Sequence, residues 1–253
     1  MMLDRAVELS AWGLAVTNLV MCAEYVHAFV ARVLRPGFLF DWSLYRLYPF
    51  GLLPVIRDIG SGGVFEAIVG ARAVSAAALL AFPHSAWALI LLLACSIAGN
   101  VRHQHGRDGA DEMALILCAG LLASALLRNA PLAWIGPCFV VAQVCLCYFV
   151  SGVAKLRTPE WVHGHALELV LGTHVYGWPA VAALARGGLG LAGCWTIVLW
   201  ESTFPLALLA PPLTAVDLAF GVLFHVGSAV VMGLNTFMLA FLSTYPVMLW
   251  AVT

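Results

Sequence analysis

Long apolar runs separated by short polar stretches dominate the chain. Each run has about the 20 residues that an α-helix needs to cross the hydrocarbon core of a bilayer. The pattern predicts an all-α fold, a polytopic membrane helix bundle of about eight transmembrane helices without strands. The predicted helices span residues 6–34, 64–83, 85–100, 109–128, 131–155, 189–210, 212–232 and 234–252.

Two stretches between the predicted helices have a different composition. Residues from about 35 to 63 are rich in Trp, Tyr, Pro and Arg, which favours a segment in the membrane interface. Residues 156–188 contain Pro159, Trp161 and Pro179, which indicates a short amphipathic or re-entrant segment. Little chain is left for a soluble domain, so we expect one transmembrane domain over residues 1–253.

The composition supports a membrane location. The chain is 63% hydrophobic and 10% charged, whereas soluble domains are about a quarter charged. Its net charge of −1 offers no basic surface for nucleic acid. The seven cysteines all lie in apolar runs, where thiols pack as small hydrophobic groups. We therefore expect an integral membrane protein that contacts membrane lipid and has no disulfide framework.

Several ionisable residues lie inside or at the ends of the predicted spans. A charged side chain at bilayer depth costs a few kcal/mol, so such residues are candidates for function. Their positions along the helices predict a shared polar cavity towards one face of the membrane. The candidates are Glu24, His27, Asp111, Glu112, Lys155, Glu201 and His225.

Each candidate also has a structural interpretation. Lys155 can extend its ammonium group to the interface from a helix end. Glu201 and His225 can form a polar pair that joins two helices. Asp111 can be an N-terminal helix residue favoured by the helix dipole. The sequence leaves these alternatives open.

Two pairs of histidines raise the question of a metal site. They are His103 with His105 and His163 with His165. Neither pair has the i, i+4 spacing on a helix or the cysteine partners of a zinc signature. We therefore expect interfacial histidines and no bound metal.

The stretch YFVSGVAKLRTPEWVHGHALELV, residues 148–170, resembles the Y-F-x-x-G-x-x-K-L…W-x-x-G signature of the vitamin K-dependent gamma-carboxylase-like family. This family is also called the horizontally transferred transmembrane domain family. LWESTFPLALL and FHVGSAVVMGLNTFMLAFLSTYP downstream, and NVRHQHGRDGADEMALIL and GFLFDWSLYRL upstream, are similar to further family segments. The resemblance covers most of the chain. It is strongest to short bacterial relatives without the lumenal domain, including the sporulation-delaying toxin maturation type, which implies a bacterial inner membrane location.

The resemblance implies a membrane-embedded enzyme with carboxylase-like lyase or quinol-dependent oxygenase chemistry. In the family, the lysine of the signature deprotonates reduced vitamin K, so Lys155 is implied as general base on reduced vitamin K, menaquinone or another lipid-soluble substrate, with O2 or CO2 chemistry. Asp111, which stands where the family has a functional histidine, and Glu24, Glu201 and His225 are implied to orient the substrate or relay protons. The implied cofactor contacts are Trp161, His105 and Tyr148. A peptide is a further candidate substrate.

Two other functions remain open at this point. The chain can be a non-catalytic membrane partner that escorts or matures a secreted peptide, with the segments at 35–63 and 156–188 as its docking face. It can also be a proton-coupled carrier that uses Glu24, Glu201 and His225, although no inverted repeat is visible in the sequence.

Overall fold

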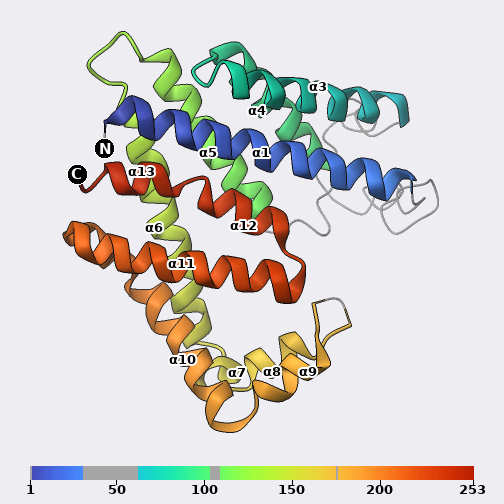
Figure 1. Ribbon diagram of the computed structural model, residues 1–253, viewed down its shortest axis with the longest axis vertical. Helices are drawn as coiled ribbons and strands as arrows, with labels where there is room; N and C mark the ends of the chain where they lie inside the picture. The colour runs from blue at the N-terminus through green and yellow to red at the C-terminus, as the bar shows by residue number, and fades with distance from the viewer. Residues whose placement is uncertain (1, 31–61, 103–108, 175) are drawn as a thin grey trace, which may run out of the picture. The chain divides into compact units, whose positions relative to one another are not determined.

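A computed structural model of the chain describes residues 2–30, 62–102, 109–174 and 176–253. Every regular element in these ranges is a helix (Figure 1), which confirms the predicted all-α fold. The helices form two compact units, one of residues Val7–Pro137 and one of Met1–Ala6 with Cys138–Thr253.

The Val7–Pro137 unit contains most of α1 (Leu3–Val30), together with α3 (Gly62–Ala81), α4 (Ala86–Arg102) and α5 (Gly109–Leu126). Helix α4 packs against both α3 and α5. The short turn between α3 and α4 is stabilised by Ser85, whose hydroxyl accepts a hydrogen bond from the backbone N–H of Ala88 at 3.3 Å. This is the contact by which a serine caps the start of a helix.

The other unit contains nearly all of α6 (Ile135–Leu156) and the rest of the chain. Its further elements are α7 (Pro159–Val162), α8 (Ala166–Leu171), α9 (Pro179–Leu184), α10 (Gly187–Thr203), η2 (Phe204–Leu209), α11 (Pro211–Met232), α12 (Asn235–Leu242) and α13 (Tyr245–Trp250). Helix α10 contacts the short helices α7 and α8, while α11 contacts the 3-10 helix η2 and helices α12 and α13.

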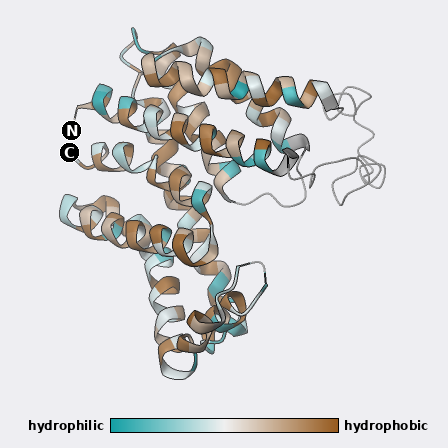
Figure 2. Ribbon diagram, turned by 45° about the vertical axis from the view of Figure 1, so that its right-hand side comes forward, coloured by the Kyte–Doolittle hydropathy of each residue, from teal (hydrophilic) through white to brown (hydrophobic). Residues whose placement is uncertain are grey.

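Among the described residues, six stretches of helix are long and apolar enough to cross a membrane. Figure 2 shows apolar residues along most of the length of the long helices. The six are Leu3–His27, Gly63–Ala81, Gly109–Leu126, Ile135–Leu156, Gly187–Leu209 and Pro211–Met232. A shorter apolar helix covers Ala86–Asn100. The chain is therefore an integral membrane protein, and its apolar helices contact membrane lipid.

Prolines change two of the predicted helices. Residues 234–252, predicted as one helix, form α12 and α13 with a break at Ser243 and Thr244, because Pro246 lies in the first turn of α13. Proline has no N–H to donate and clashes with the preceding turn, so it starts a helix more readily than it continues one. The predicted helix 189–210 likewise changes to the 3-10 helix η2 next to Pro205.

The two predicted interfacial segments have different outcomes. Residues 35–61 of the first segment lie outside the described residues. The second segment, 156–188, contains the three short helices α7, α8 and α9. Pro159 and Pro179 are the first residues of α7 and α9, which is the helical position that proline favours. Location in the membrane interface stays a prediction for both segments.

Candidate functional site

Lys155, in the last turn of α6, binds Glu201 of α10. Its Nζ donates hydrogen bonds to Glu201 Oε2 at 2.5 Å and to Ser151 Oγ, one turn earlier on α6, at 2.6 Å. The two charged side chains are only 18% and 5% exposed. The amine is thus directed to a carboxylate within the protein, and not outward along the helix as in the interfacial interpretation.

A glycine lets the two helices approach closely beside this pair. A Cβ atom added at Gly152 would lie 2.5 Å from the backbone nitrogen of Ser202 and 2.9 Å from the carbonyl carbon of Glu201. Only a residue without a side chain fits against the α10 backbone there. Gly152 therefore sets the distance between α6 and α10 at which Lys155 reaches Glu201.

The short helix α7 brings an aromatic ring to the amine. Lys155 Nζ lies 5.1 Å from the centroid of the Trp161 ring, within the range of a cation–π contact. Two contacts hold this region on α10. Trp195 Nε1 donates a hydrogen bond to the carbonyl of Val162 at 3.2 Å, and Gly164, with φ at 83°, packs against the backbone of Leu191.

A second buried polar group joins α6, α11 and α13. The Tyr148 hydroxyl lies 2.6 Å from His225 Nε2 and 3.2 Å from the Tyr245 hydroxyl. A side chain at Gly221 would overlap the Tyr245 hydroxyl, so this glycine makes room for the contact. The three side chains form a hydrogen-bonded chain that can pass a proton between a phenol and an imidazole.

Aromatic rings enclose His225, which is fully buried. The Phe241 ring stacks on the imidazole at 4.7 Å between centroids, and Phe224 and Phe237 lie at 5.1 and 5.0 Å. Nδ1 of this histidine is buried and has no hydrogen-bond partner among the described residues. The same holds for Trp200 Nε1 and Ser202 Oγ.

The structure brings together some of the predicted site residues. Lys155, Glu201 and Trp161 meet, and Tyr148 meets His225. The predicted alternative of a Glu201–His225 pair is not what the structure has, because each of these residues binds another partner. Glu24 and Asp111 belong to the other compact unit, so their convergence on Lys155 stays a prediction. His105 lies outside the described residues.

Sequence reasoning missed an ionisable residue in the other unit. Arg72 of α3 is 2% exposed; its Nε donates to Asn18 Oδ1 at 2.7 Å and its Nη2 donates to Met21 Sδ at 2.9 Å. Arg72 could have been identified from the sequence, because its guanidinium group lies inside an apolar run and this criterion selected the other candidates. The contribution of Ser151 was also missed, although it lies one helical turn from Lys155.

The histidine pairs are accounted for only in part. His163 and His165 are exposed, and His103 and His105 are outside the described ranges. In the part of the chain that the structure describes, no three His, Cys, Asp or Glu side chains are grouped as metal ligands.

Comparison of the chain with protein-family models, with curated proteins and with solved structures finds no match.

Proposed function

We propose that this chain is a membrane-embedded enzyme in which Lys155 acts as a general base on a lipid-soluble quinol. The resemblance of residues 148–170 to the vitamin K-dependent gamma-carboxylase-like family suggests this class of reaction. The observation that carries the proposal is the short hydrogen bond between Lys155 and Glu201 at 2.5 Å, with both side chains largely removed from solvent.

The pair supplies a way to make the amine a base. A protonated lysine has no lone pair and cannot accept a proton. Glu201 is the proton acceptor within reach of the amine, and transfer of the proton to it would leave a neutral amine beside a neutral carboxyl group, which avoids two charges in apolar surroundings. Ser151 keeps the amine in place during this transfer through its hydrogen bond. Lys155 is then ready to take a proton from a substrate hydroxyl group.

The surrounding residues suit a quinol. The Trp161 ring offers a flat aromatic face beside the amine, and Ser202 next to Glu201 has a buried hydroxyl without a described partner. When bound, a reduced vitamin K or menaquinone would supply an acidic hydroxyl group and the electrons for reaction with oxygen. Trp161 would orient the quinol ring, and the apolar helices would hold its prenyl tail and exclude water.

The Tyr148–His225–Tyr245 chain is proposed to relay protons in the same unit. Its 2.6 Å contact between the phenol and the imidazole is short enough for proton transfer. We also propose that the membrane is a bacterial inner membrane, which rests on the resemblance to short bacterial relatives.

The test uses purified protein in lipid nanodiscs that contain menaquinol or reduced vitamin K. Wild-type protein should consume oxygen in a quinol-dependent manner. Lys155→Arg keeps a cation beside Glu201 but cannot be deprotonated, so we expect a folded protein without this activity. Arg186→Lys, which changes an exposed cation in the same unit, is the matched control and should remain active. Equal activity of wild-type protein and Lys155→Arg would contradict the assignment of the base.

A further inference from the structure

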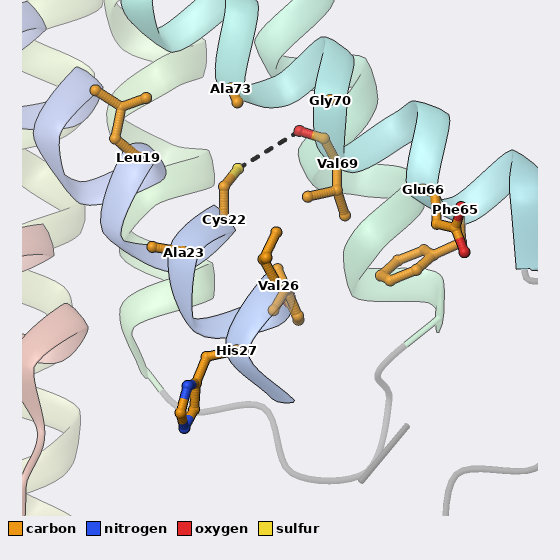
Figure 3. A pocket seen from close by; sticks show the side chains of 11 residues that line it. Leu19, Cys22, Ala23, Val26, His27, Phe65, Glu66, Val69, Gly70 and Ala73 are labelled. Atoms are coloured by element: carbon orange, nitrogen blue, oxygen red, sulfur yellow. Dashed lines mark hydrogen bonds between the residues drawn. The ribbon is translucent and has the colours of Figure 1, made fainter. Parts of the chain in front are cut away.

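The Val7–Pro137 unit contains a groove between α1 and α3 with a volume of about 720 Å³. This is within the range of about 300–1,000 Å³ that small-molecule sites have. Figure 3 shows its lining residues, which come from the C-terminal part of α1 and the N-terminal part of α3. The two helices are joined beside the groove by a hydrogen bond from the Cys22 thiol to the Val69 carbonyl at 3.6 Å.

The groove is apolar along most of its length and polar at one end. Leu19, Val26, Val69 and Ala73 supply aliphatic walls. His27 and Glu66 also line it, and both are exposed. His27 is the last residue of one apolar span and Glu66 is near the start of the next. The polar end of the groove therefore lies at the end of the spans, where lipid head groups meet the hydrocarbon core.

The two polar side chains indicate the chemistry of an occupant. A carboxylate can only accept hydrogen bonds, and beside apolar surface it is stabilised by a cation that donates to it. Neither Glu66 nor His27 has a hydrogen-bonding or ionic partner in the described ranges of the chain. A primary ammonium group would satisfy Glu66.

We propose that this groove is a binding site for a phospholipid with a primary ammonium head group, as in phosphatidylethanolamine. One acyl chain lies along the aliphatic walls, and the ammonium group binds Glu66. The site belongs to the other unit from Lys155 and is independent of the proposed enzyme activity.

Gly70 offers a direct way to fill the groove. It lines the groove, and a Cβ atom added there would meet no other atom within 4 Å. Gly70→Leu should therefore place its side chain in the space proposed for the acyl chain without disturbing the packing of α3. Gly63, also on α3, has the same open surroundings but does not line the groove. Gly63→Leu is the matched control.

The experiment is native mass spectrometry of the full chain after reconstitution with an equal mixture of phosphatidylethanolamine, phosphatidylcholine and phosphatidylglycerol. Wild-type protein and Gly63→Leu should each retain phosphatidylethanolamine in preference to the other two lipids. Gly70→Leu should reduce this retention by about tenfold or more. Glu66→Gln removes the charged acceptor and should reduce the preference for the ammonium lipid by about tenfold.

Three outcomes would overturn the proposal. The first is retention of no lipid by the wild-type protein. The second is equal retention by Gly70→Leu and Gly63→Leu, which would place the lipid elsewhere. The third is preference for a lipid without a primary ammonium group, or for added menaquinol over phospholipid, which would contradict the role of Glu66. Circular dichroism of each variant checks that its helices are intact.

Discussion

Lys155 and Glu201 show how two ionisable residues can be accommodated within membrane-spanning helices. Each would be costly alone, but each satisfies the other, and Ser151 and Trp161 add a hydrogen bond and a cation–π contact to the amine. Such a buried pair contributes less to stability than its short distance suggests, because both groups lose their hydration. We interpret the pair as a means of placing a reactive amine, and its contribution to stability as secondary.

Removal of one partner of this pair should destabilise the protein strongly. Lys155→Met leaves the Glu201 carboxylate buried without its cation, and we expect a loss of about 3 kcal/mol in the free energy of unfolding. The double variant Lys155→Met with Glu201→Leu removes both charges and should recover most of that loss. Unfolding by denaturant in detergent, followed by circular dichroism, measures these differences.

The exposed pair of Arg186 and Glu168 provides the control for this cycle. Its side chains are 67% and 34% exposed, so Arg186→Met should cost less than about 1 kcal/mol. Equal losses for Lys155→Met and Arg186→Met would show that Lys155 and Glu201 are not held in a buried pair.

At the scale of whole elements, glycines decide how the helices of this unit meet. Gly152 allows contact between α6 and α10, and Gly164 allows the segment after α7 to pack against α10. Both belong to residues 148–170, the stretch that contains Lys155. Close packing at these two glycines therefore fixes the position of the Lys155 amine.

Gly152→Ala should separate α6 from α10. The added methyl group would meet the backbone at Ser202 and Glu201, and such overpacking costs about 1–3 kcal/mol. Gly63→Ala is the matched control, because its surroundings are open, and it should be neutral or stabilising by up to about 1 kcal/mol. Thermal unfolding of both variants in the same detergent makes the comparison. Stability of Gly152→Ala equal to that of Gly63→Ala would contradict the close approach.

The positions of the helices could be predicted from the sequence better than their interruptions. Apolar runs of the right length predict spans because the bilayer fixes the length of a helix. The breaks near Pro205 and Pro246 were missed because hydrophobicity alone does not reveal where a proline inside an apolar run interrupts the helix. The partners of Glu201 and His225 were also beyond prediction, since which faces of two helices meet depends on packing at positions such as Gly152 and Gly221.

At the scale of the whole molecule, one lysine accompanies 11 arginines among the 253 residues of the chain. Arginine cannot lose its proton near neutral pH, whereas lysine can. The only amine side chain in the sequence is thus the one that binds Glu201 inside the protein. This distribution agrees with a role for Lys155 that requires gain and loss of a proton, and it makes Lys155 visible to a site-specific measurement without further labelling.

Nitrogen NMR of protein labelled with 15N-lysine in nanodiscs reports on the buried pair of Lys155 and Glu201, because the single lysine of the chain gives one Nζ signal. We predict a signal distinct from that of lysine in water, moved by Glu201→Gln and by added menaquinol but not by Glu168→Gln. A signal identical to that of aqueous lysine, and unchanged by Glu201→Gln and by menaquinol, would show that Lys155 is neither paired with Glu201 nor in contact with a quinol.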